Sequence, residues 1–198
     1  MAYVGLKCLV VAKLSSHTPG SEPTYEAGRI IGKMIQANLN ITRGNNPLHA
    51  DDEVAEDDNS ITAMSVELGV DDIMEDDQAY MGLVEAKTTG TGTDAVTTYY
   101  DTDAPAEDCG TGYIRVRRKG GITSYQGIWI YSTKYGFTSE NAQTKAEQIQ
   151  WQTPTVTGNA RPLLVDDTGR AKFRKRQNFT AYADAFAWIK AQGNVPAT

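Results

Sequence analysis

The residue types that carry out nucleophilic or metal chemistry are few and scattered in this chain. Its two histidines, His17 and His49, lie in segments of loop composition, and neither stands beside a Ser or Cys in a nucleophile-elbow pattern such as GxSxG. A zinc site needs clustered ligands, and two Cys and two His at distant positions do not supply them. We therefore expect a protein that is not an enzyme and that carries no metal or cofactor.

Glycine-rich phosphate loops are also not indicated. The run TTGTGTD at 88–94 lacks the third glycine, the preceding strand and the following helix of a dinucleotide fingerprint, and the sequence contains no P-loop motif. The surrounding segment, 85–112, is rich in Thr, Gly, Ala and Asp, which predicts a loose chain with one short strand at Tyr99 and Tyr100.

Carboxylates are concentrated in one part of the chain. Twelve acidic residues and no basic one lie between Asp51 and Asp77, which is typical of a solvated surface. A secreted or surface β-sandwich binding module with an acidic calcium loop is the alternative, although neither DDEVAEDDNS nor DDIMEDDQ has the Asp-x-Asp-x-Asn-Gly register of a calcium loop. A carbohydrate enzyme with paired carboxylates is a further alternative, disfavoured because a general acid needs burial to raise its pKa.

Basic and aromatic residues come together along 115–131. Arg115, Arg117 and Arg118 precede Tyr125, Trp129 and Tyr131, a combination that can stack and hold single-stranded nucleic acid. The net charge of -6 and the pI near 4.9 argue against affinity for a phosphate backbone. We expect DNA contact, if any, to be non-adhesive.

Cysteine use and hydropathy give expectations about processing. Cys8 lies in an apolar strand pattern and Cys109 in a glycine-rich segment, so two free thiols are expected, although spacing alone leaves a bridge between them open. No apolar run approaches the ~18 residues that cross a bilayer, and the N-terminus lacks a basic segment followed by an apolar one. Neither export by a signal peptide nor membrane insertion is expected.

The periodicities predict a mainly β (α+β) domain covering residues 1–198. Alternating patterns predict strands at 2–14, 30–43 and 60–70, with Val4, Leu6, Cys8 and Val10 on one side of the first. Lys119-Gly120-Gly121 predicts a hairpin turn between strands at 113–118 and 122–133. A break at Gly136-Phe137 precedes a short helix at 139–148, capped by Ser139. A strand at 150–157 contains Pro154 and should lie at an edge or begin after the proline.

The remaining segments are a connection and a tail of contrasting charge. Residues 44–59 form a long acidic loop, and loops of that length usually have a function. The segment 160–198 combines basic residues, a turn at 166–169 and a terminal helix at 180–192, capped by Thr180 and ended by Gly193. Tyr182, Ala185, Phe186 and Ile189 form one apolar stripe of that helix, which we expect to pack in the core.

Three stretches, taken in order, resemble the major tail protein (tail tube protein) family of long-tailed bacteriophages. They are HADDEVAEDDNSITAMSVELGVDD at 49–72, GYIRVRRKGGITSYQGIWIYSTKYGF at 112–137 and TKAEQIQWQTPTVTG at 144–158. Together with the first strand they cover most of residues 1–160, and the similarity weakens beyond that point. The resemblance rests on the order in which these stretches follow one another.

The resemblance implies a fold and an assembly. The fold is a two-sheet β-sandwich or partial barrel with a flanking helix, here 139–148, and six copies form a ring whose inner strands make a continuous barrel. Hairpins 33–70 and 113–133 are the candidates for the inner wall, and loop 44–59 matches the loop that reaches the neighbouring ring. The implied partners are further copies, tape measure, tail tip and terminator proteins, with DNA as transiting cargo. The implied location is the virion tail, assembled in the host cytoplasm.

Two groups of site residues follow as hypotheses. Alternation in 60–70 sends Thr62, Met64, Val66, Leu68 and Val70 to one face and Ser65 and Glu67 to the other, so Ser65 and Glu67 are predicted to line the bore. Opposite charges are predicted to stack successive rings, and charge reversal at Asp57 and Asp58 should weaken that stacking. The predicted stacking residues are Asp51, Asp52, Glu53, Glu56, Asp57, Asp58, Arg115, Arg117, Arg118 and Lys119, with the basic segment 161–176.

Overall fold

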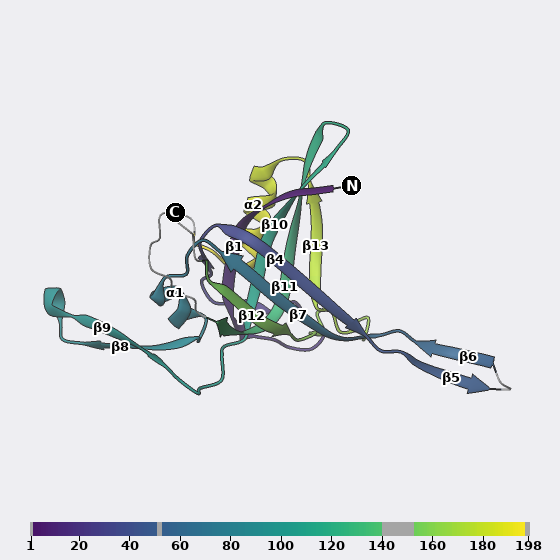
Figure 1. Cartoon of the computed structure of the whole chain (residues 1–198), viewed down its shortest axis with the longest axis horizontal. Helices are drawn as coiled ribbons and strands as arrows, with labels where there is room; N and C mark the ends of the chain where they lie inside the picture. Colours follow the sequence, from purple (N-terminus) through teal and green to yellow (C-terminus); the bar gives the residue numbers. More distant parts are fainter. Residues whose placement is uncertain (1, 51–52, 140–152, 197–198) are drawn as a thin grey trace, which may run out of the picture.

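A computed structural model describes residues 2–50, 53–139 and 153–196 (Figure 1). It is mostly β, with 55% of residues in strands and 12% in helices, which confirms the mainly β (α+β) sandwich class. The strands are β1 (Ala2–Ser16), β2 (Thr24–Tyr25), β3 (Arg29–Ile30), β4 (Met34–Arg43), β5 (Asn46–Ala50), β6 (Glu53–Asp58), β7 (Ile61–Val70), β8 (Val84–Thr89), β9 (Val96–Asp101), β10 (Cys109–Lys119), β11 (Ile122–Ser139), β12 (Thr155–Ala160) and β13 (Arg174–Phe179). The helices are α1 (Glu75–Tyr80), a short 3-10 turn η1 (Gly92–Asp94) and α2 (Tyr182–Gln192).

One nine-stranded antiparallel sheet organises the described chain. Its order is β2-β1-β10-β11-β12-β7-β4, with β3 added to β1 and β13 added to β11. The 18-residue strand β11 is shared between two branches, because residues 125–130 pair with β13 and residues 133–139 pair with β12. The sheet then curls until β4 lies beside β1, which makes a partial barrel.

The inside of this barrel is the main hydrophobic core. Alternate residues of the strands point inward, including Leu9 and Val11 of β1, Leu68 of β7, and Ile128 and Ile130 of β11, all essentially inaccessible to solvent. Removing such side chains from water is the largest favourable contribution to folding. The β-branched and aromatic composition of these strands suits this packing.

A second core lies between the outer face of β1, β10 and β11 and helix α2. Trp129, Ile114, Ala185 and Ile189 are buried there, so the predicted stripe of the terminal helix is a packing surface as expected. Gly112 faces this layer, and an added Cβ would lie 2.5 Å from the Trp129 ring. The missing side chain is therefore what lets the indole cross β10.

The predicted hairpin of β10 and β11 is confirmed. Lys119 pairs with Ile122, and Gly120 and Gly121 both have positive φ, at 58° and 82°. Glycine takes this conformation at little cost, which is why two of them can close the turn. Pro154 precedes β12, which begins at Thr155 and lies between β11 and β7 in the interior of the sheet.

Several local expectations were wrong. Strand β11 continues through Gly136 and Phe137 to Ser139, so the chain does not break there, and the rest of the helix predicted at 139–148 lies outside the described residues. Thr180 does not cap α2, whose N-cap is Ala181 with no capping side chain. The short strand expected at Tyr99 and Tyr100 is present as β9, but it pairs with β8 over its whole length, so residues 84–101 form a hairpin and not the loose chain that was expected.

The single face predicted for the first strand is also wrong. Register shifts after Tyr3 and after Lys7 interrupt its pairing with β10, and Cys8 has a φ of 56°. Each bulge changes which residues face inward. Val4 is consequently 57% exposed, Leu6 packs on the barrel core, and Cys8 and Val10 belong to the layer under α2.

Candidate functional site

The outer face of β4, β7 and β12 is a polar surface, which we call the polar wall. On β7, Met64, Val66, Leu68 and Val70 are buried in the barrel, whereas Ser65 and Glu67 point outward and are half-buried. The alternation predicted for this strand is therefore confirmed, although the predicted role in lining a bore stays a prediction. The helix α2 lies over the other half of the sheet (Figure 1).

Amides and hydroxyls dominate the polar wall. Glu67 pairs in register with Asn38 of β4 and Thr157 of β12, and Ser65 with Asn40 and Asn159. Gln36 donates its Nε2 hydrogen to Glu67 Oε1 at 2.7 Å, and Asn38 donates to Glu67 Oε2 at 3.4 Å. These bonds hold the Glu67 carboxylate against the sheet, so the wall is nearly neutral with a small negative bias.

The predicted acidic loop is largely a hairpin. β5 and β6 pair from Asn46↔Asp58 to Ala50↔Glu53, and the hairpin extends the β4–β7 pair far beyond the barrel (Figure 1). Glu53, Glu56, Asp57 and Asp58 lie on β6, whereas Asp51 and Asp52 fall outside the described residues. The backbone of this arm is thus a projecting two-stranded ribbon.

The acidic run of the sequence is divided in space. Asp71 to Asp77 lie near α1, where Glu75, Asp76 and Asp77 occupy the first helical turn, a position that the helix dipole favours. Arg29 Nη1 lies 3.3 Å from Asp77 Oδ1, and its guanidinium lies 4.6 Å from the centre of the Tyr80 ring. These carboxylates belong to the body of the molecule and are separate from the β5–β6 arm.

Arg115 and Arg117 meet around Tyr3 at one end of the barrel. Their guanidinium carbons lie 5.1 and 5.3 Å from the centre of the Tyr3 ring, and Arg117 Nη2 donates to Tyr3 Oη at 3.2 Å. This hydrogen bond, with the neighbouring positive charge, lowers the pKa of Tyr3. Arg115 also donates to Tyr113 Oη at 3.2 Å.

Strand β13 adds two arginines to this group, which we call the arginine cluster: Arg115, Arg117, Arg174 and Arg176. Burial first, and then repulsion from Arg176 and Arg115, lower the pKa of Arg174. None of the four forms an ion pair with a carboxylate in the described part of the chain. Arg118 and Lys119, predicted to act with them, instead lie exposed at the tip of the β10–β11 hairpin.

Several cations of the basic segment 161–176 form ion pairs within the described part of the chain, and the predicted role of this segment in stacking stays a prediction. Arg161 Nη2 pairs with Asp108 at 3.0 Å, Lys175 pairs with Glu22 at 2.8 Å, and Lys172 pairs with Asp166. These cations are neutralised within the chain. The contacts of Tyr3 and Tyr113 with the arginine cluster were not predicted from the sequence. The one available signal was spacing: Arg174 and Arg176 are two positions apart, as are Arg115 and Arg117, so each pair lies on one face of its strand.

Aromatic stacking on nucleic acid is not available where the sequence suggested it. Trp129 and Tyr131 are buried under α2, and Tyr25 Oη both accepts a hydrogen bond from Trp129 Nε1 at 3.1 Å and donates one to the Tyr131 carbonyl oxygen at 2.8 Å. Tyr125 packs against Tyr182 with ring centres 5.8 Å apart. These aromatic rings pack in the second hydrophobic core and are not exposed for stacking on bases.

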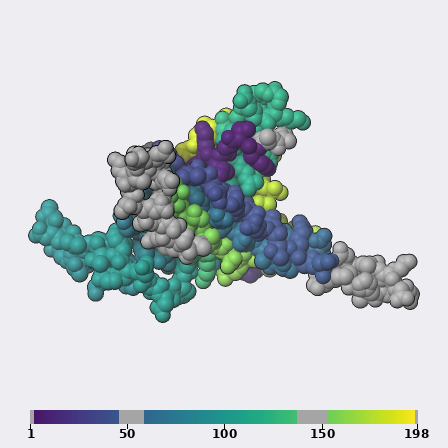
Figure 2. All heavy atoms as spheres, viewed as in Figure 1, coloured from purple at the N-terminus to yellow at the C-terminus, as the bar shows by residue number. Residues whose placement is uncertain are grey.

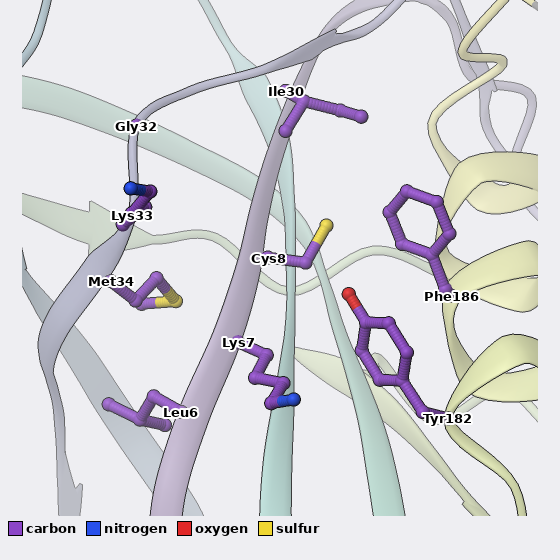
Figure 3. Close-up of a pocket in the computed structure, with 9 residues that line it drawn as sticks. All are labelled: Leu6, Lys7, Cys8, Ile30, Gly32, Lys33, Met34, Tyr182 and Phe186. Carbon is purple, nitrogen blue, oxygen red and sulfur yellow. The ribbon is translucent and has the colours of Figure 1, made fainter.

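Two cavities flank the first half of β1. One, of about 460 Å³, lies between β1 and β4 and is lined by Tyr3, Leu6, Ile35 and Arg115 among others. The second, of about 440 Å³, lies between β1, the 30–34 segment and α2, and Figure 3 shows Tyr182 and Phe186 pointing from the helix toward Cys8. Burial raises the pKa of Cys8 to about 11, so its thiol is unreactive at neutral pH.

The described residues contain no group of three or more His, Cys, Asp or Glu side chains placed to hold a metal ion. Neither α1 nor α2 has the length and apolar character of a membrane-spanning helix. No protein-family model and no curated protein matches the sequence. The cysteines are both free, Cys109 buried and Cys8 half-buried.

Proposed function

We propose that this chain is a tail tube protein, six copies of which close into a ring that stacks on others to form a hollow conduit for DNA. The observation that carries the proposal is the polar wall: a sheet with one face buried in the barrel and the other lined by amides and hydroxyls. Its partners are other copies, together with tape measure, tail tip and terminator proteins. Its location is the virion tail, after assembly in the host cytoplasm.

The polar wall has the electrostatic character that a DNA passage requires. Duplex DNA carries one negative charge per ~1.7 Å of its axis, so a basic lining would bind it and stall transit. Charges within about 8 to 10 Å of the strand, roughly one Debye length, act on it. Glu67, hydrogen-bonded to Gln36 and Asn38, supplies a fixed negative charge, and the amides around it supply none.

The edge of the wall favours continuation into a neighbouring copy. Strand β4 is hydrogen-bonded to β7 alone among the described strands. Its first part lies beside β1 without pairing to it, and Ile35, at a register shift, is 55% exposed in the cavity between the two strands. An edge strand whose backbone groups have no hydrogen-bonded neighbour strand on one side is a site for pairing with another chain. In the proposed ring, this edge is where the sheet of one copy meets the next.

The projecting β5–β6 hairpin supports stacking of rings. It carries four carboxylates on β6 and stands clear of the barrel, where it can reach another copy (Figure 1). Figure 2 shows a second extension, the β8–β9 arm, on the opposite side of the body. Long arms on a small body bury little surface in a monomer, so their ordering favours an assembled state.

Negative-stain electron microscopy of the purified protein tests the proposal directly. The expected result is rings or long hollow filaments, which appear as protein concentration is raised. Isolated particles at every concentration and salt condition tried would contradict it. A calcium-binding surface module, the alternative from the sequence, predicts monomers whose melting temperature rises with added calcium.

A pair of matched variants makes the test specific to the β4 edge. Ile35→Lys places a charge on the exposed edge and should abolish rings while leaving the monomer folded. Met74→Lys changes an apolar side chain that is 65% exposed at the start of α1, outside β4 and outside both arms, and should leave assembly unchanged. Equal assembly of both variants would remove β4 from the proposed ring contact.

A further inference from the structure

The arginine cluster holds positive charge that the described chain does not neutralise. Arg115 and Arg117 lie on β10 and Arg174 and Arg176 on β13, with β11 between the two strands. In a folded protein, clustered cations are ordinarily paired, because like charges at close range are destabilising. Among the described residues, six other basic side chains, including those of Arg29 and Arg161, do form ion pairs. The cluster therefore presents positive charge that has no carboxylate partner in the described part of the chain.

The arginines share one face of the sheet and one spacing. In the strand register, Gln126 of β11 lies between Arg115 of β10 and Asn178 of β13. Ile128 of β11 lies in the same way between Tyr113 of β10 and Arg176 of β13. All of these positions face the inside of the barrel, where its core ends and the surface begins. Each arginine pair is separated by two residues, or about 6.8 Å along an extended strand.

The cluster is held in place by polar groups that retain bonding capacity. Asn178 Oδ1 accepts from Arg117 Nη1 at 3.2 Å and from Gln126 Nε2 at 3.1 Å. Two atoms of this network, Arg117 Nε and Gln126 Oε1, are buried without a hydrogen-bond partner, and Gln126 is only 5% exposed. Leaving a buried donor unpaired is unfavourable, so a carboxylate oxygen that reached Arg117 Nε would be stabilised there, whereas Gln126 Oε1 is itself an acceptor and gains no hydrogen bond from a carboxylate.

We propose that the arginine cluster is the receptor for the carboxylate-rich strand β6 of a second copy. Glu56 and Asp58 are two residues apart on β6, the same spacing as the arginines, and Asp57 and Glu53 add to its charge. The hairpin leaves its own barrel from the β4–β7 end and reaches away from it, so a neighbouring molecule receives it (Figure 1). This contact is heterologous and repeats from copy to copy, and it rests on the proposed tube function.

Peptide binding to the full-length chain, kept below the concentration at which it assembles, tests the receptor separately. The probe is a fluorescein-labelled peptide of residues 46–59, and its anisotropy is followed as protein is added at low salt. We expect saturable binding that weakens as salt is raised. A peptide with Glu56, Asp57 and Asp58 replaced by Gln, Asn and Asn should bind at least about tenfold more weakly. A tenfold rise in Kd corresponds to a loss of about 1.4 kcal/mol in binding free energy.

Receptor variants locate the site. The double variant Arg117→Gln, Arg174→Gln should weaken binding by about tenfold or more, whereas Arg118→Gln, at the exposed hairpin tip, should change it less than about twofold. If the double variant does not fold, the exposed Arg176→Glu supplies the same test. Circular dichroism of each variant confirms that its fold is intact.

The outcomes separate this inference from the proposed function. Absent peptide binding, or equal loss with Arg118→Gln, overturns the receptor, even if the protein still forms tubes. Specific binding by a protein that never forms rings supports the receptor and contradicts the tube. Displacement of the peptide by millimolar inorganic phosphate at constant ionic strength would indicate a general anion site and overturn the assignment to β6.

Discussion

The two halves of the barrel wall are built differently. β1, β10 and β11 are buried on both faces, by the barrel core on one side and by α2 on the other, whereas β12, β7 and β4 are buried on one face only. The covered half contains the largest buried side chains, including Trp129 and Tyr113. The comparison indicates that stability resides mainly in the covered half, which leaves the open half free to present a polar surface.

The largest loss is expected from Trp129→Ala in the covered half. This side chain is fully buried between α2 and the sheet, so its removal leaves a large cavity. We expect the free energy of unfolding to fall by about 3–5 kcal/mol, measured by urea denaturation. A loss below about 1 kcal/mol would mean that α2 contributes little to the fold.

Leu68→Ala applies the same kind of change to the open half. Leu68 is buried inside the barrel, but its strand has solvent on the opposite face, where the structure can relax. The expected loss is roughly 2–3 kcal/mol, the lower part of the range for Leu→Ala. Equal losses for the two variants, measured in the same denaturant series, would break the distinction between the halves.

Glu67→Gln probes the polar wall itself. Gln keeps a carbonyl oxygen that can accept from Gln36 or Asn38, and the site is partly open to solvent. We expect a change in unfolding free energy below about 0.5 kcal/mol, the usual size for surface positions. A loss above about 1.5 kcal/mol would show that this carboxylate stabilises the monomer.

The smallest effect on stability is expected from Ser65→Cys, which tests exposure of the wall chemically. At pH 8 an ordinary thiol with a pKa near 8.5 is about one-quarter ionised, whereas Cys8, with a pKa of about 11, is ionised to roughly one part in a thousand. Burial also raises the pKa of Cys109, to about 12. Labelling with a thiol reagent should therefore modify the variant much faster than the unsubstituted chain, and comparable rates would contradict an exposed wall.

Period-two alternation predicted the open half well and the arginine cluster poorly. In β7 the pattern directly reports which side is buried, because only one face meets the core. In β1 two bulges change the register, so alternation placed Val4 on the wrong face and did not predict that Tyr3 lies beside the arginines. Arg174 and Arg115 are 59 residues apart in the sequence, and only the pairing of β13 with β11 brings them together.

Local turn and pairing preferences explain the other successes and failures. The Gly120-Gly121 turn was predictable because its backbone conformation selects glycine. The β5–β6 hairpin was read as a loop because its acidic composition disfavours a strand, and tertiary extension from the β4–β7 pair prevails over that preference. Likewise, the ion pairs of Arg161 with Asp108 and of Lys175 with Glu22 depend on where distant segments meet, which composition does not report.

Strand β11 runs unbroken through both branches of the sheet, so one continuous strand connects the covered half of the barrel to the open half. A force applied to the polar wall is transmitted through β12 to β11. Strand β11 is also hydrogen-bonded to β10 and to β13, which contains Arg174 and Arg176 of the arginine cluster. Antiparallel ladders loaded along their strands must shear many hydrogen bonds together, so tension shared between copies would be borne without the two halves separating.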